Sequence, residues 1–281
     1  MTEPQPFIFD VHLDLSMNAM EWNRDLTQPL EQIRICEANQ TDKPDRSLGT
    51  VCLPEMRKGN VGLCVATQIA RYTKQKNPLP GWHSPAQAWA QSQGQLSWYN
   101  EVERQGELTQ ICNLEQLESH LEKWSTGQNK QLPIGYVLSL EGADSIITLQ
   151  HLESAYEKGL RAIGPAHYGP GTYAPGTGES GPLGNGATEL LREMERLNII
   201  LDVTHLSDTS LDQALDTFSG TVWASHCNCR TLVPGERQLN DHQLKRLIER
   251  GGVIGAALDA WMLIPDWQRG LTTPQSSGVK L

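Results

Sequence analysis

The sequence lacks the features that mark membrane, secreted and disulfide-stapled proteins. It has no run of about 20 apolar residues, and its first residues show neither a positively charged start nor an apolar stretch of signal-peptide length. We therefore expect no membrane span and a cytoplasmic location. The six cysteines include no CxxC pair, and a protein of 281 residues does not need disulfide bonds to stabilise its core. We expect reduced thiols, most of them buried.

A basic block that could follow a phosphate backbone is also missing. The sequence has 23 Lys and Arg residues against 33 Asp and Glu residues, which gives a formal net charge of -10. This balance argues against a nucleic-acid partner. Internal repeats, coiled-coil heptads and low-complexity tracts are absent too. The length permits one large domain or two smaller ones, and we expect a single domain over residues 1–281.

What the sequence does contain is a series of short apolar runs. Each run is too short for a helix and is rich in Val, Ile and Leu, which is typical of a strand buried on both faces. Seven such strands are predicted, at residues 7–11, 61–67, 134–140, 160–166, 199–204, 221–225 and 252–258.

Segments with helical boundaries lie between the strands. Residues 85–106 begin at a proline and end at a glycine, residues 187–198 are amphipathic, and residues 240–252 run from an Asn cap to a glycine. Alternating strands and helices predict an α/β fold with a parallel sheet.

Two long stretches interrupt this alternation, each after the C-terminus of a predicted strand. They are residues 18–60 and the Gly- and Pro-rich residues 164–186. In a β/α barrel, long loops at this end build the active site, so their length indicates a covered pocket. A decorated loop without function explains the length equally well.

Five potential metal ligands stand at the ends of predicted strands. His12 and Asp14 end the first strand, Glu141 ends the third, and His205 and His226 end the fifth and sixth. Side chains from different strand ends converge only if the sheet closes into a barrel. The positions therefore favour a TIM-type (β/α)8 barrel with its site at the carboxyl ends of the strands.

Imidazoles and carboxylates are the ligands that Zn²⁺ and similar divalent ions take. Three histidines and two carboxylates suffice for two ions if one carboxylate bridges them. Each motif alone is weak, because a single histidine at a strand end is commonly a hydrogen-bonded structural residue. The coincidence of all five favours a metal site, whereas His83, His120, His151 and His242 are expected at the surface.

The order of these motifs resembles one known family. HxD at 12–14, LEG at 140–142, DVTH at 202–205 and ASH at 224–226 are similar to the renal (membrane) dipeptidases, metallopeptidases of the amidohydrolase-like barrel superfamily. The segment EWNRDL after the HxD motif is similar to the bacterial branch of that family.

The resemblance implies a set of site residues. It implies two zinc ions, with His12 and Asp14 on one, His205 and His226 on the other, and Glu141 bridging both.

The resemblance also implies two substrate-binding residues. His167 would stabilise the developing oxyanion, and Arg237, eleven residues after His226, would pair with the terminal carboxylate of the substrate. The alternatives are that His167 packs against Tyr168 in a loop and that Arg237 lies at the surface. Arg230 is a second choice whose offset does not match the family.

One part of the family pattern is not found. Family members have an Asp at the tip of an eighth strand, in a Gly-Ser-Asp type segment, and this sequence contains no such segment. We therefore expect about seven strands, with the eighth missing and the protein incomplete at its C-terminus. A shortened homologue, in which another segment or subunit covers the gap, is the alternative. Asp259, at the tip of the seventh strand, is expected to contact substrate, with a substitute acid/base role or a simple strand end as alternatives.

The function expected from these features is that of a zinc-dependent dipeptidase, in which a water bridging the two metals near Glu141 attacks the peptide carbonyl. Its partner would be a small dipeptide-like substrate, and the resemblance suggests a homodimer. The alternatives are a related metal hydrolase acting on an N-acyl amino acid, lactone or cyclic amide, and a metal-binding fragment without catalytic activity.

Overall fold

The computed structural model describes residues 6–74, 79–125 and 131–272. The protein forms two compact units. The first unit consists of Met1–Glu141 and Ser145–Ala162, and the second of Gly142–Asp144 and Ile163–Leu281. The organisation as a single domain stays a prediction.

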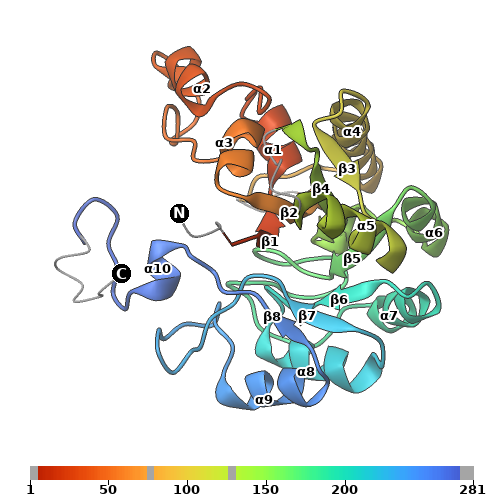
Figure 1. Cartoon of the computed structure of the whole chain (residues 1–281). Helices are drawn as coiled ribbons and strands as arrows, with labels where there is room; N and C mark the ends of the chain where they lie inside the picture. Colours follow the sequence, from red (N-terminus) through yellow and green to blue (C-terminus); the bar gives the residue numbers. More distant parts are fainter. Residues whose placement is uncertain (1–5, 75–78, 126–130, 273–281) are drawn as a thin grey trace. The chain divides into compact units, whose positions relative to one another are not determined.

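Four parallel strands form the sheet of the first unit (Figure 1). β2 (Val61–Gln68) pairs with β1 (Ile8–Leu13) and with β4 (Ile134–Glu141), and the short β3 (Leu108–Gln110) also pairs with β4. β2 and β4 are buried along almost their whole length. This burial explains why they appear in the sequence as continuous apolar runs rather than as an alternating pattern.

The longest helix of the first unit, α4 (Pro85–Arg104), confirms the prediction for residues 85–106. The hydroxyl of Ser84 caps it by accepting a hydrogen bond from the amide of Gln87, and Pro85 occupies the first turn. The unit also contains the helices α1 (Leu15–Met20), α2 (Leu30–Glu37), α3 (Leu53–Lys58), α5 (Leu114–Ser125) and α6 (Leu149–Glu157).

Residues 18–60 differ from the expected long loop, because α1, α2 and α3 lie in or overlap this stretch. These helices have at most eight residues, a length at which a helix depends on tertiary contacts rather than on its own propensity. Buried Leu26 and Leu53 supply such contacts, and the Leu53 amide donates to the Leu26 carbonyl. Contacts of this kind leave no periodic signal in the sequence.

The second unit contains three short parallel strands, β6 (Ile200–Asp202), β7 (Val222–Ala224) and β8 (Val253–Ile254). Its helices are α7 (Ala187–Arg196), α8 (Asp208–Thr217), α9 (Asp241–Glu249) and α10 (Ala260–Leu263). α8 and α9 lie together on one side of the strands (Figure 1). The Asn240 side chain and Gln243 form a capping box at the start of α9, which confirms the predicted Asn cap.

All seven predicted strands are present, and β5 (Leu160–Gly164) spans the boundary between the two units. Two details differ. β3, which has only three residues, was not predicted, and the last predicted strand, residues 252–258, is confined to β8. β8 is short because only Val253 and Ile254 pair with β7, after which the backbone leaves strand geometry.

The prediction that His120 lies at the surface is wrong. Its side chain is 4% exposed, and its Nε2 lies 2.7 Å from the carbonyl oxygen of Gly62. Gly135 lies against the same ring so closely that a Cβ atom there would be 2.7 Å from Nε2. His120 is therefore a hydrogen-bonded core residue, and burial lowers its pKa.

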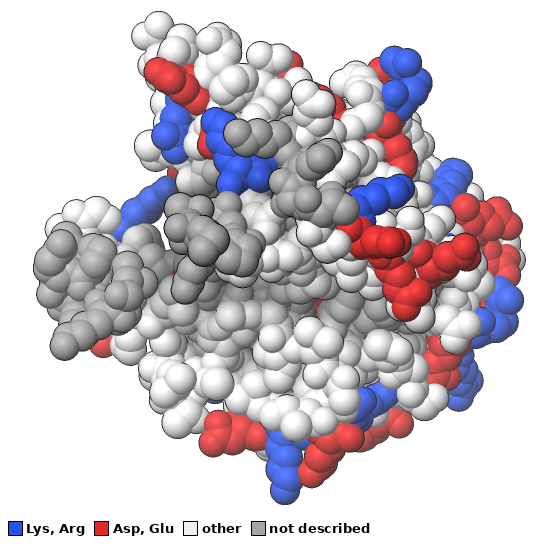
Figure 2. All heavy atoms as spheres, viewed as in Figure 1, with Lys and Arg blue, Asp and Glu red and all other residues white. Residues whose placement is uncertain are grey.

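All six cysteines are free, as expected, but only half are buried: Cys52, Cys64 and Cys227. No helix within the described residues combines the length and the hydropathy that crossing a membrane requires. On the viewed face, acidic and basic side chains intermingle over α8 and α9 (Figure 2), where Arg246 pairs with Asp212 and Asp216 at 2.9 and 2.5 Å.

Candidate metal and substrate site

Three predicted ligands come together in the first unit. His12 lies in β1, Asp14 directly follows it, and Glu141 is the last residue of β4, so parallel pairing through β2 brings them to one edge of the sheet. The His12 Nε2 atom lies 3.5 Å from Asp14 Oδ1 and 3.5 Å from Glu141 Oε2. These three side chains form a compact set of nitrogen and oxygen ligands.

The electrostatics of this set favour a cation. Burial alone would lower the pKa of His12, but the charges of Glu141 and Asp14 outweigh burial and raise that pKa well above its ordinary value. Glu141 itself is only 7% exposed. Two carboxylates around one imidazole are a donor set that fits a divalent ion such as Zn²⁺.

Asp14 is held by a buried hydroxyl network. Thr67, in β2, donates a hydrogen bond from its hydroxyl to Asp14 Oδ1. The Thr67 carbonyl in turn accepts hydrogen bonds from Ser16 Oγ and from the Tyr99 hydroxyl, both at 2.8 Å. Tyr99 is fully buried and stacks on Tyr136, so the network is packed into the core.

A second network reaches Asp14 from the side of α2. Asn18 Nδ2 donates to the Asp14 carbonyl at 2.9 Å, and Asn18 Oδ1 accepts from Arg24 at 2.8 Å. Arg24 forms a two-point ion pair with Glu37, at 2.7 and 3.2 Å, and Glu37 is 2% exposed. Arg46 pairs with the same carboxylate at 2.8 Å.

Three histidines come together in the second unit. His167 follows β5, His205 follows β6 and His226 follows β7. The His205 ring centroid lies 4.6 Å from that of His167 and 5.2 Å from that of His226. The predicted positions at successive strand ends therefore correspond to neighbouring side chains.

The backbone at the ends of β6 and β7 positions His205 and His226. The Asp202 carboxylate accepts hydrogen bonds from the amides of Thr204 and Ser225, at 3.0 and 3.1 Å, and so ties the ends of β6 and β7 together. His205 has a φ of +69°, in the left-handed region that residues other than glycine adopt uncommonly. Such an outlier at a candidate ligand is typical of a functional constraint.

Hydroxyl groups contact the same ring nitrogen in two of these histidines. His205 Nδ1 lies 2.9 Å from the Thr177 hydroxyl, and His226 Nδ1 lies 2.8 Å from the Ser225 hydroxyl. With Nδ1 engaged, each ring would bind a metal through Nε2, an arrangement common among metal-bound histidines. Neither hydroxyl was predicted from the sequence. Ser225 could have been found from its adjacency to His226, but Thr177 is 28 positions from His205.

The loop of residues 164–186 has no helix or long strand, as predicted, yet it is ordered by backbone contacts. The Gly169 amide donates to the Thr177 carbonyl, and the Thr177 amide donates to the His167 carbonyl, both at 2.9 Å. A Cβ atom at Gly176 would lie 1.6 Å from the His167 carbonyl oxygen, so only glycine fits. This fold-back places the Thr177 hydroxyl beside His205.

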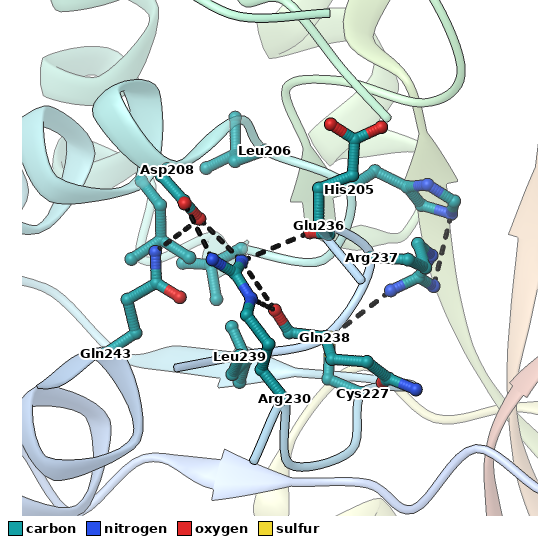
Figure 3. Close-up of a pocket in the computed structure, with 12 residues that line it drawn as sticks. His205, Leu206, Asp208, Cys227, Arg230, Glu236, Arg237, Gln238, Leu239 and Gln243 are labelled. Carbon is teal, nitrogen blue, oxygen red and sulfur yellow. Dashed lines mark hydrogen bonds and ion pairs between the residues drawn. The ribbon is translucent and has the colours of Figure 1, made fainter. Parts of the chain in front are cut away.

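Arg237 lies within the same group of residues (Figure 3). It is 6% exposed, and its guanidinium contacts His205 Nε2 at 3.4 Å, Cys227 Sγ at 3.4 Å and the His226 carbonyl at 3.0 Å. None of the carboxylates in the described residues lies within ion-pair distance of it. The alternative that Arg237 lies at the surface is therefore wrong.

Arg230, the second choice for the substrate carboxylate, has a different environment. Its guanidinium forms a two-point ion pair with Asp208, at 2.7 and 2.8 Å (Figure 3). Asp259 precedes α10, is exposed, and accepts a hydrogen bond from the indole of Trp261 at 2.9 Å. Its contact with substrate stays a prediction.

Solved structures share the fold of this protein. A metallopeptidase described as dipeptidase AC superposes with a TM-score of 0.75 at 21% identity, over 96% of this chain and 77% of that one. A metallopeptidase from Rhodobacter sphaeroides, liganded with a phosphinate mimic of the dipeptide L-Ala-D-Ala, gives a TM-score of 0.69 at 20% identity, over 90% and 74%. These likenesses confirm the predicted α/β fold of the (β/α)-barrel type.

The protein is also similar in sequence to a curated dipeptidase. Dipeptidase tcpJ of Claviceps purpurea is 29% identical over 140 residues, which cover 47% of this chain and 33% of that protein. An uncharacterized protein in the PQQ-III 3′ region of Acinetobacter calcoaceticus is 28% identical over 149 residues, 50% of this chain and 47% of that protein. The matches thus span less than half the length of these curated relatives.

A family profile covers nearly the whole sequence. The profile described as membrane dipeptidase, peptidase family M19, matches residues 4–273. This range contains every candidate ligand at the strand ends, together with His167 and Arg237. The chain belongs to the membrane dipeptidase family, M19.

Proposed function

We propose that this protein performs zinc-dependent hydrolysis of the peptide bond in small dipeptides. Family membership supports a metallopeptidase, and the observation that supports the substrate class is the buried cation Arg237 beside His205. A buried charge without an opposite charge costs several kcal/mol, so such a site favours an anionic ligand. The terminal carboxylate of a dipeptide is an anion of the right shape for a guanidinium.

The proposed metal ligands are the residues at the strand ends. His12 and Asp14 would hold one zinc, His205 and His226 a second, and Glu141 would be shared between the two. Their nitrogen and oxygen donors fit this metal, and with Nδ1 of His205 and His226 beside a hydroxyl, ligation would fall to Nε2. At His205 the metal would replace the 3.4 Å contact between Nε2 and Arg237. When bound, zinc supplies a Lewis acid that polarises the peptide carbonyl and lowers the pKa of water.

Three protein side chains would bind and position the substrate and the water. Arg237 would fix the carboxylate end of the dipeptide, which positions its peptide bond. His167, 4.6 Å from the His205 ring, would donate a hydrogen bond to the oxyanion that develops on the carbonyl. Glu141 would hold the attacking water near the scissile carbonyl.

A substrate panel tests the reaction class. Purified, zinc-supplemented protein is assayed with dipeptides, with the same dipeptides amidated at the C-terminus, and with N-acyl amino acids. Turnover of dipeptides with a strong preference for the free carboxylate is expected. Activity confined to N-acyl amino acids, which also have a carboxylate, would replace the peptidase proposal by that of a related amidohydrolase.

Metal analysis tests the ligands separately from turnover. His205→Asn tolerates the positive φ of this position and is expected to lose bound zinc, whereas His242→Asn, at an exposed position of α9, keeps it. Bound zinc without any turnover in the native protein would identify a metal-binding piece that lacks catalytic activity. Sedimentation of the same samples tests the homodimer that the family resemblance implies.

A further inference from the structure

We propose that the Asp208–Arg230 ion pair is a clamp that positions Arg237 to receive the substrate carboxylate. The inference rests on the proposed function, because it assigns a purpose to residues that would not themselves touch substrate. All of its members lie in the second unit and are seen together in Figure 3.

Arg230 donates hydrogen bonds to the backbone on both sides of Arg237. Its Nε and one terminal nitrogen donate to the Gln238 carbonyl at 2.9 and 2.7 Å, and the same terminal nitrogen donates to the Glu236 carbonyl at 3.3 Å. These carbonyls belong to the residues immediately before and after Arg237. One guanidinium therefore fixes the backbone from which the other guanidinium projects.

Arg230 is itself fixed by two helix beginnings. Asp208, the first residue of α8, accepts its two ion-pair contacts. Asp208 also accepts a hydrogen bond at 2.9 Å from Gln243, which is 1% exposed and belongs to the capping box of α9. The clamp is thus anchored to two helices rather than to the turn that contains Arg237.

The side chain of Arg237 depends on this backbone support. Its own partners are a thiol, an imidazole and a carbonyl, all of which are weak acceptors beside a carboxylate. Further contacts tie the same turn, since the Asn228 amide donates to Gln238 Oε1 at 3.0 Å and the Arg230 amide donates to the Leu239 carbonyl at 2.8 Å. The alternative is an ion pair that only stabilises the fold, and a binding measurement separates the two roles.

The test measures the carboxylate preference of binding. A phosphinate analogue of Ala-Ala and its C-terminal carboxamide are titrated by calorimetry into the zinc-loaded protein, and the preference is the ratio of the two dissociation constants. Arg237→Met serves as the reference that removes the preference. Arg230→Lys keeps a positive charge beside Asp208, but an ammonium lacks the planar fork that donates to both carbonyls. Asp208→Asn removes the ion pair that holds Arg230 in place.

A matched control comes from the same helix pair. Arg246, on α9, directs its hydrogen bonds and ion pairs to Asp212 and Asp216 of α8 rather than to the turn around Arg237. Arg246→Lys is therefore the same substitution in a comparable ion pair away from that turn. Thermal unfolding of all variants checks that each one folds.

We expect the carboxylate preference to fall about tenfold or more in Arg230→Lys and Asp208→Asn, corresponding to at least about 1.4 kcal/mol. Binding of the carboxamide should stay the same, and Arg246→Lys should resemble the native protein. An unchanged preference in both clamp variants, with the preference lost in Arg237→Met, overturns the clamp and leaves the proposed function intact. A native protein without any preference overturns the assignment of Arg237, and the clamp with it.

Discussion

The Thr177 hydroxyl oxygen lies 2.9 Å from Nδ1 of His205, and it reaches this position through the fold-back of a Gly-rich loop. A hydroxyl on the far nitrogen of a ligand histidine fixes its tautomer and its orientation. Thr177→Val keeps the shape of the side chain and removes the hydrogen bond. We expect zinc affinity to fall roughly 10- to 100-fold, measured by competition with a chelator.

Thr217→Val is the control for this substitution. Thr217, at the end of α8, donates its hydroxyl to the Gln213 carbonyl and contacts no candidate ligand. Zinc affinity should stay at the native value. Equal losses in both variants would mean that Thr177 acts through general stability rather than through His205.

Asn18 links Asp14 to the buried Arg24–Glu37 ion pair. Asn18→Ala removes both of its side-chain hydrogen bonds, while the ion pair and the 3.0 Å hydrogen bond from the Asn18 amide to the Asp14 carbonyl stay in place. We expect weaker zinc binding, roughly tenfold by analogy with other residues that support a ligand, and a small change in stability. A chelator titration that gives the native affinity would contradict this connection.

The free energy of unfolding of the first unit should fall at low pH because Glu37 becomes protonated. Burial alone would raise the pKa of its carboxyl, but hydrogen bonds from Arg24, the Ser47 amide and Arg46 outweigh burial and lower that pKa to about 2. A depressed pKa stabilises the folded state above the ordinary value of 4.5, and this contribution is lost as pH falls from 4.5 toward 2. The shift corresponds to about 3 kcal/mol.

Glu37→Gln should therefore lower the free energy of unfolding at neutral pH and flatten its dependence on acid, as measured by urea denaturation at several pH values. Glu101→Gln is the comparison, because Arg104 lowers the pKa of Glu101 to about 2 as well, yet the Glu101 side chain is 50% exposed. Solvent screens such a pair, so little change is expected. An acid dependence unaffected by Glu37→Gln would show that other carboxyls govern it.

Gly176→Ala should disrupt the loop that contains Thr177. The new Cβ atom would lie 1.6 Å from the His167 carbonyl oxygen, so the backbone must shift and the contact between Thr177 and His205 is lost. Gly178→Ala meets no atom within 4 Å but has a φ of +89°, which costs about 1 kcal/mol. We expect loss of zinc affinity and faster proteolysis for Gly176→Ala, with a much milder effect for Gly178→Ala.

The elements that could be predicted are those whose own residues have a periodic or boundary signal. Buried strands such as β2 and β4 were found because parallel packing leaves continuous apolar runs. α4 was found from its starting proline and terminal glycine, and α9 from its Asn240 cap. β3 and the helices α1–α3 were missed because they depend on contacts with distant residues. The helices α5, α6, α8 and α10 were not predicted either.

The same division applies to the candidate site. Residues at the ends of strands, such as His205 and His226, could be selected because strand ends are visible in the sequence. The supporting roles of Thr177 and Arg230 could not, since these residues reach their targets through loop geometry. His120 was misjudged for a related reason, because its hydrogen bond to Gly62 joins residues 58 positions apart.

The left-handed backbone of His205 also limits how this position can change by mutation. A single-nucleotide change in a histidine codon reaches Asn and Asp, which are the non-glycine residues best suited to a φ of +69°. Both replace a ring nitrogen by an oxygen on a shorter side chain. Genetic drift that keeps this backbone intact would therefore lead toward oxygen ligands, and toward a preference for harder metal ions.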